Sequence, residues 1–278
     1  MAGNHDTQTR DTPEMHETGF RHAAGLVRIA RVVRVVWFVS LVMPAAAEAQ
    51  DVLSRFELQL EGAYLVSDDP RFNWVFDFGA ELDAVDWGGG RATFAAGYEA
   101  IAGQEFRRFD VNQGNYLLEG ILAFRAGAFE IGPVWHHVSR HLSDRPKRFP
   151  IDWNMIALRA AGRPRAGGLA LAWHADARRT VTRAFVDYDW ELEAAASAVG
   201  RLGGRWSAAA AASLRAVGVD GSRERGAQWG GRVEGGVRLG GRVAAGELFV
   251  AVERRVDPYP AEFGTARWLT AGLRLRPR

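Results

Sequence analysis

Apolar and polar residues alternate with a period of two from about Arg55 to Arg274, in segments close to the length of a strand that crosses an outer membrane. Residues two apart on a strand lie on the same face, whereas apolar positions on a helix recur at three and four. The alternation therefore predicts β-strands. In the first segment the apolar positions Phe56, Leu58, Leu60 and Tyr64 alternate with the polar positions Glu57, Gln59 and Glu61.

About twelve such segments occur, and bacterial outer-membrane barrels have an even number of strands. Their connections alternate in length. The short ones are rich in glycine and cover 88–91, 126–127, 163–167, 200–204 and 240–241. The long, charged ones cover 102–114, 140–151, 176–188, 218–227 and 256–265, and the first connection, 67–71, is short. Short periplasmic turns and long external loops are typical of outer-membrane barrels.

Two folds place the alternating faces oppositely. A β-sandwich or a calycin-like barrel buries the apolar face, whereas a membrane barrel turns it outward. The polar face carries both signs of charge, and we expect Glu119 to pair with Arg125, and Glu234 with Arg232 and Arg238, across a narrow lumen. This mixture favours the second fold. We therefore predict an all-β protein, a transmembrane antiparallel up-and-down β-barrel of about 12 strands over residues 50–278, in the bacterial outer membrane.

The N-terminal segment, residues 1–49, is predicted to be a cleaved signal peptide. Three arginines precede an uncharged run over 35–47, and Ala47-Glu48-Ala49 fits a cleavage site. The run is shorter than the roughly 20 residues that a membrane-spanning helix needs. An N-terminal anchor is the alternative.

Composition excludes some function classes. The net charge of +2 provides no strongly basic face, so we expect no nucleic acid partner. The absence of cysteine excludes disulfides and thiolate metal sites, and we expect no metal. We predict an interfacial girdle made of Trp74, Trp135, Trp153, Trp173, Trp190, Trp229 and Trp268. The expected partners are the barrel assembly machinery, outer-membrane lipid and lipopolysaccharide, the last through Arg145, Lys147 and Arg148, although the chain ends on Pro277-Arg278 without a terminal aromatic residue.

Candidate chemistry is concentrated in one predicted hairpin. His137 and Ser139 lie two apart on the face assigned to lipid, and Asn154 lies on the same face of the next segment. A serine nucleophile needs a nearby base, and the base needs a third group to hold its tautomer. We therefore predict a site with Ser139 as nucleophile, His137 as general base and Asn154 as the residue that orients it, with His141 and Asp144 as alternates.

The hairpin resembles two families. His137-Val138-Ser139 and Trp153-Asn154 resemble outer-membrane phospholipase A, a twelve-stranded barrel with its Ser-His-Asn site on the outer wall. That resemblance implies lipid acyl hydrolysis and calcium as the only expected cofactor, although Arg140-His141 stands where the family has Asn-Gly. Lipid A deacylases also combine a His-x-Ser pair with an acid, here Asp144 or Asp152.

The second resemblance is closer in local sequence. His137-x-Ser139-x-His141-Leu142-x-Asp144 is similar to a motif of an uncharacterised bacterial family of barrel-like proteins, and it implies no activity. Two functions therefore stay open. The first is a non-enzymatic barrel, structural or transporting a small solute, and the alternative is a membrane-embedded lipid acyl hydrolase.

Overall fold

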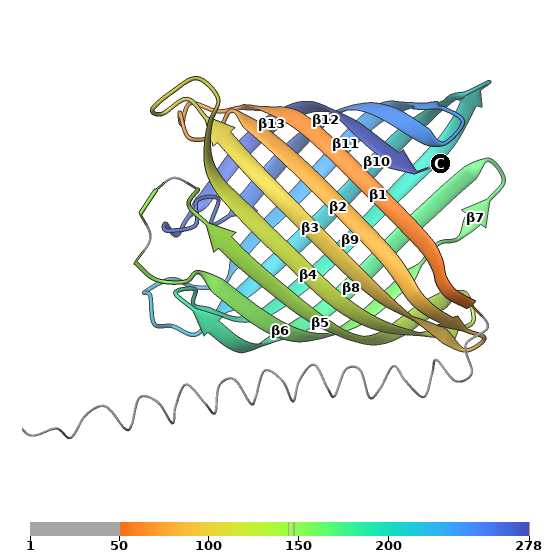
Figure 1. Cartoon of the computed structure of the whole chain (residues 1–278), viewed down its shortest axis with the longest axis horizontal. Helices are drawn as coiled ribbons and strands as arrows, with labels where there is room; N and C mark the ends of the chain where they lie inside the picture. The colour runs from red at the N-terminus through yellow and green to blue at the C-terminus, as the bar shows by residue number, and fades with distance from the viewer. Residues whose placement is uncertain (1–50, 144, 147, 278) are drawn as a thin grey trace, which may run out of the picture. The chain divides into compact units, whose positions relative to one another are not determined.

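Strands form wherever the sequence alternates, and they join into one closed antiparallel barrel in the computed structural model, which describes residues 51–143, 145–146 and 148–277 (Figure 1). The strands are β1 (Asp51–Val66), β2 (Trp74–Trp87), β3 (Gly90–Gly103), β4 (Asp110–Ala126), β5 (Phe129–His141), β6 (Asp152–Gly162), β7 (Arg165–Ala166), β8 (Leu169–Ala184), β9 (Tyr188–Gly203), β10 (Trp206–Val219), β11 (Gln228–Gly240), β12 (Ala244–Val256) and β13 (Thr265–Pro277). The two-residue β7 pairs only with the start of β8, so the wall consists of twelve long strands.

Each long strand pairs with its neighbour in sequence, and β6 pairs directly with β8. The barrel closes between β1 and β13, which pair over Leu60–Val66 and Leu269–Leu275. This closing junction has seven residue pairs, whereas β1 and β2 share twelve. The barrel confirms the predicted fold class. No helix among the described residues is long and apolar enough to cross a membrane.

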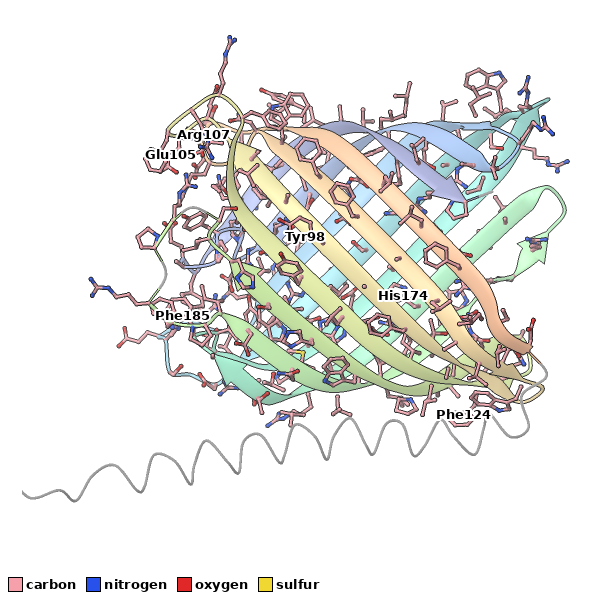
Figure 2. The ribbon with its side chains drawn as sticks, in the orientation of Figure 1. Tyr98, Glu105, Arg107, Phe124, His174 and Phe185 are labelled. Carbon is pink, nitrogen blue, oxygen red and sulfur yellow. The ribbon has the colours of Figure 1, made fainter. Side chains whose placement is uncertain are left out.

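The apolar face points outward. On β12 the side chains of Leu248 and Val252 are 67% and 63% exposed, whereas those of Glu247 and Glu253 are 3% and 8% exposed. Figure 2 shows side chains projecting from both sides of the wall, with Phe124 near the short turns. A closed barrel with apolar side chains outside and ionised ones inside satisfies its backbone groups within the wall, as a membrane requires. The chain is therefore a transmembrane β-barrel, the architecture of bacterial outer-membrane proteins.

The inward charges pair between strands, but not all as expected. Glu234 contacts Arg232 and Arg274, whereas Arg238 pairs with Glu247. The expected Glu119–Arg125 pair is wrong. Glu119 lies deep in the lumen and binds His136 and Arg159, and Arg125 lies at the short-turn end, where it binds Asp86. The two side chains point inward at different depths of the same strand.

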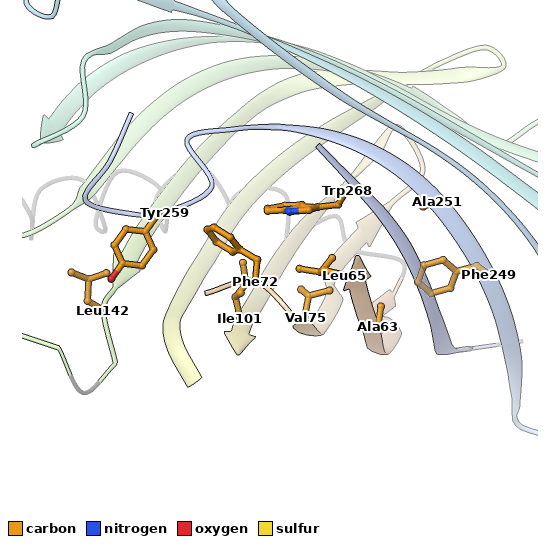
Figure 3. Packing of buried hydrophobic residues seen from close by; sticks show 10 residues of the cluster. All are labelled: Ala63, Leu65, Phe72, Val75, Ile101, Leu142, Phe249, Ala251, Tyr259 and Trp268. Atoms are coloured by element: carbon orange, nitrogen blue, oxygen red, sulfur yellow. The ribbon is translucent and has the colours of Figure 1, made fainter. Parts of the chain in front are cut away.

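Two apolar clusters pack inside the loop end of the lumen. The first, shown in Figure 3, joins residues of the wall to Phe72, Leu142 and Tyr259 from three connections at this end. The second surrounds Tyr188 and Met155. Two tryptophans assigned to the outer girdle, Trp153 and Trp268, are instead inside these clusters and only 3% exposed. Both side chains face inward because they pack against these apolar clusters, which a water-filled barrel would lack.

The strands extend further than the sequence predicted. The connection expected over 176–188 is wrong, since β8 continues to Ala184 and only residues 185–187 connect it to β9. Asp176 and Arg178, which suggested a polar loop, are inside the lumen and paired with each other. Figure 1 shows the C-terminus at the end of the barrel that carries the short turns. The predicted signal peptide, residues 1–49, lies outside the described residues, as do Asp144 and Lys147.

Candidate functional site on the outer wall

Strands β5 and β6 carry the predicted site at the loop end of the wall. His137, Ser139 and His141 share the outer face of β5, because they are two residues apart. His136 points inward and lies 2.8 Å from a Glu119 oxygen. The register places His137 opposite Asn154 and Ser139 opposite Asp152 on β6. The predicted residues therefore meet on one face.

His137 and Asn154, predicted to act together, are in contact. His137 Nδ1 lies 3.0 Å from Asn154 Oδ1, and Asn154 Nδ2 donates to Thr182 Oγ1 at 2.9 Å. With the Asn154 amide oxygen facing the ring, the His137 tautomer that donates from Nδ1 would leave Nε2 as an acceptor. Trp135 stacks parallel to the ring, with centroids 5.9 Å apart. Asn154 therefore contacts the edge of the His137 ring, and Trp135 stacks on its face.

The serine has a different partner from the one expected. Ser139 Oγ lies 3.0 Å from His141 Nε2, so the alternate histidine, His141, is the one within hydrogen-bond distance of the serine hydroxyl. The ring of Tyr116 meets the His141 ring edge-on, with centroids 5.3 Å apart. His137 and His141 flank Ser139 along the strand, one on each side, so both rings lie on the outer face that bears the hydroxyl.

An apolar surface surrounds these polar groups. Tyr116, Trp135, Ile156 and Leu158 are 47%, 37%, 51% and 54% exposed on the outer wall. Polar side chains in such a position are costly unless they are hydrogen-bonded to one another or used in function. This hairpin is distinguished by two hydrogen-bonded pairs on a lipid-facing wall, His137 with Asn154 and His141 with Ser139.

Two residues of the site were not predicted from the sequence. Thr182 contacts Asn154 from β8, next to an irregularity where the β6–β8 register shifts between Asn154 and Met155. Tyr116 reaches His141 from β4. Strand order and register decide both contacts. The alternation of single segments carries no signal for them.

The rim loops are tied together by charge. Arg145 binds Glu105 and Asp110, both at 2.9 Å or less, and Figure 2 shows Glu105 and Arg107 at this end of the barrel. In the first loop, Arg71 binds Asp69, and this hydrogen bond holds the pKa of the Asp69 carboxyl below its usual value. Burial raises the pKa of Tyr259. The guanidinium of Arg145, expected to touch lipopolysaccharide, is used in holding two loops together.

The lumen offers a second kind of site. A cavity of about 810 Å³ occupies the short-turn half, and one of about 460 Å³ lies towards the loops. Ser213, Arg232 and Arg274 line both. Over the outer cavity, the connection 257–264 folds inward, with Arg140 donating to the carbonyl oxygens of Asp257 and Pro258. The described residues contain no cluster of three or more His, Cys, Asp or Glu side chains placed to hold a metal.

No protein-family model matches the chain, and no curated protein matches it. Among solved structures, outer membrane phospholipase A from Escherichia coli is similar at 10% identity and a TM-score of 0.49, covering 81% of this chain and 92% of that one. The NanC porin is similar at 8% identity and a TM-score of 0.48, over 80% and 99% of the two chains. The KdgM porin, solved in complex with disordered oligogalacturonate, has 8% identity and a TM-score of 0.45, over 80% and 98%. These similarities concern the barrel fold and do not identify a function.

Proposed function

We propose that the barrel hydrolyses acyl esters of membrane lipid on its outer wall, with Ser139 as nucleophile and His141 as the base. The observation that carries the proposal is the 3.0 Å contact between Ser139 Oγ and His141 Nε2, beside a second histidine held by Asn154. A serine, a base within hydrogen-bond reach and a lipid-facing position are the elements that such a reaction needs.

The chemistry follows from these positions. Ser139 Oγ attacks the ester carbonyl carbon while His141 Nε2 takes the hydroxyl proton, and the acyl carbon becomes bonded to Oγ. The same histidine returns the proton to the departing lipid alcohol. A water molecule then attacks the acyl carbon while the histidine takes a proton from it, the bond between that carbon and Oγ breaks, and the histidine returns the proton to Oγ as the fatty acid leaves. His137 Nε2 is a second acceptor on the other side of Ser139, and Asn154 is a positioning residue for it.

The test uses the full mature barrel refolded in detergent and given phospholipid or lipid A, with calcium or with a chelator. Ser139→Ala should abolish fatty-acid release. Removing a general base costs about 10²–10⁴-fold in rate, so we expect the rate of His141→Gln to fall at least about 100-fold. His137→Gln should fall less, because its ring does not contact the hydroxyl. A folded barrel that releases no fatty acid from any lipid contradicts the proposal, and a larger decrease in His137→Gln than in His141→Gln transfers the role of base to His137.

A second candidate function, transport of a small solute, is favoured by the 810 Å³ cavity. The path towards the outside is covered by the connection 257–264, where buried Asp257 accepts hydrogen bonds from Tyr188 and Arg225. Conduction therefore requires this cover to move. Planar-bilayer recording should show a nearly closed wild-type barrel and larger conductance after Asp257→Ala. Equal conductance in both would contradict transport through the lumen.

A further inference from the structure

The cavity at the short-turn half of the lumen has an excess of positive charge. Of the charged side chains lining it in the described part of the chain, eight are arginines and five are carboxylates. The cavity towards the loops has the opposite balance, six arginines and seven carboxylates. Most of these groups are paired. Two of the arginines, Arg163 and Arg276, lack a full partner.

Arg163 is the first of them. It begins the connection after β6, and its nearest carboxylates are Glu81 at 3.7 Å and Glu57 at 3.9 Å, which is beyond hydrogen-bond distance. Both carboxylates are already in contact with Arg55. The side chain of Arg163 is 56% exposed. Its guanidinium therefore extends across the cavity towards β1 and β2, with its hydrogen-bonding capacity unused by the residues described.

Arg276 is the second. It lies near the end of β13, two residues beyond Arg274, so both point inward. Its Nε is buried and has no hydrogen-bond partner among the described residues. β13 adjoins β1, the strand that carries Glu57, towards which Arg163 reaches. Two under-partnered guanidinium groups thus line the same cavity, one reaching in from the connection after β6 and the other from β13.

We propose that this cavity binds a multivalent oxyanion, a solute with two or more phosphate or carboxylate groups, between Arg163 and Arg276. A guanidinium presents a planar fork of donors that fits such groups. The cavity volume accommodates a small organic molecule. The site lies in the lumen and requires neither hydrolysis at Ser139 nor conduction.

The experiment is calorimetric titration of the full refolded barrel, in neutral detergent at fixed salt, with sodium tripolyphosphate as the probe. Removing one charge-assisted hydrogen bond weakens the Kd roughly tenfold, so Arg163→Gln and Arg276→Gln should each weaken binding about tenfold, and the double variant about a hundredfold. The matched control is Arg165→Gln on β7, which removes the same charge from an exposed residue that does not line the cavity. The control should bind like the wild type.

Three results would overturn the proposal. One is the absence of binding to the wild-type barrel. Another is a decrease in affinity in Arg165→Gln as large as in Arg163→Gln, which would show general attraction to positive charge. The third is unchanged binding in the double variant, which would locate the anion elsewhere. A heat-modifiability gel on each sample confirms that every variant is folded, and Arg163→Gln, which lies in a connection and outside the strands, provides the test if Arg276→Gln does not assemble.

Discussion

Replacing Val250 by arginine tests the orientation of the wall directly. Val250 is the central residue of β12, with six residues on either side, and its side chain is 58% exposed. Six residues at a rise of about 3.4 Å, on a strand tilted by about 40°, place it about 15 Å from either strand end. That is the centre of a hydrocarbon core about 30 Å thick. An arginine at this depth costs about 2–4 kcal/mol.

The matched control is Leu202→Arg. Leu202 is 65% exposed on the same outer face, but it is the penultimate residue of β9 at the short-turn end. There the same change should cost about 0–1 kcal/mol. The free energies are measured by urea unfolding of barrels refolded into lipid vesicles, followed by tryptophan fluorescence. Equal effects of the two substitutions, within about 0.5 kcal/mol, would refute an outward face in contact with acyl chains.

Two further predictions concern packing and pH. Gly218→Ala should destabilise the barrel by about 1–3 kcal/mol, because the added β-carbon would overlap the Trp190 ring. Gly235 has open space around it, so Gly235→Ala should change the free energy of unfolding by no more than about 0.5 kcal/mol. Equal costs of the two substitutions in urea unfolding would contradict this prediction. Asp69 has a lowered pKa, so its contribution to loop stability is present above the unfolded-state pKa and is lost as the pH falls through the folded-state pKa. Carbon NMR of the carboxyl should show titration below the value of an unfolded chain, and a normal value would refute the role of Arg71.

The strands were predictable because each repeats a local rule. One residue in two is apolar, so the sequence places Leu248 and Val252 on one face of their strand, and the mixed charges of the opposite face favoured an outward position that their exposure confirms. The inward contacts are not local. Arg178 suggested a loop because it is charged, yet Asp176, Glu191 and Glu193 satisfy it inside the lumen. The alternation identifies which residues point inward, but the depth and the partner of each depend on strand tilt and register.

The candidate site was predicted in part for the same reason. His137 and Asn154 meet because hairpin neighbours share a register, and a hairpin is short in sequence. Ser139 turns to His141 instead of His137, and both choices satisfy the spacing of two, so the sequence did not separate them. Thr182 contacts Asn154 next to a shift in the β6–β8 register, and no pattern in the sequence predicted that shift. The hydrolase, its substrate and any need for calcium stay predictions.

The junction between β1 and β13 has a consequence for how the barrel is made. In the described residues, β1 pairs with β2 from Asp51 onwards, apart from residues 53–54 at a register shift, whereas residues 51–59 have no ladder partners on β13. Unpaired backbone groups are poorly tolerated in hydrocarbon, so this half of β1 belongs near the periplasmic surface. The first and last strands close the barrel through the shorter of the two ladders that β1 makes. We expect backbone amide hydrogen exchange to be fastest along this junction, because it is the part of the wall that opens most easily.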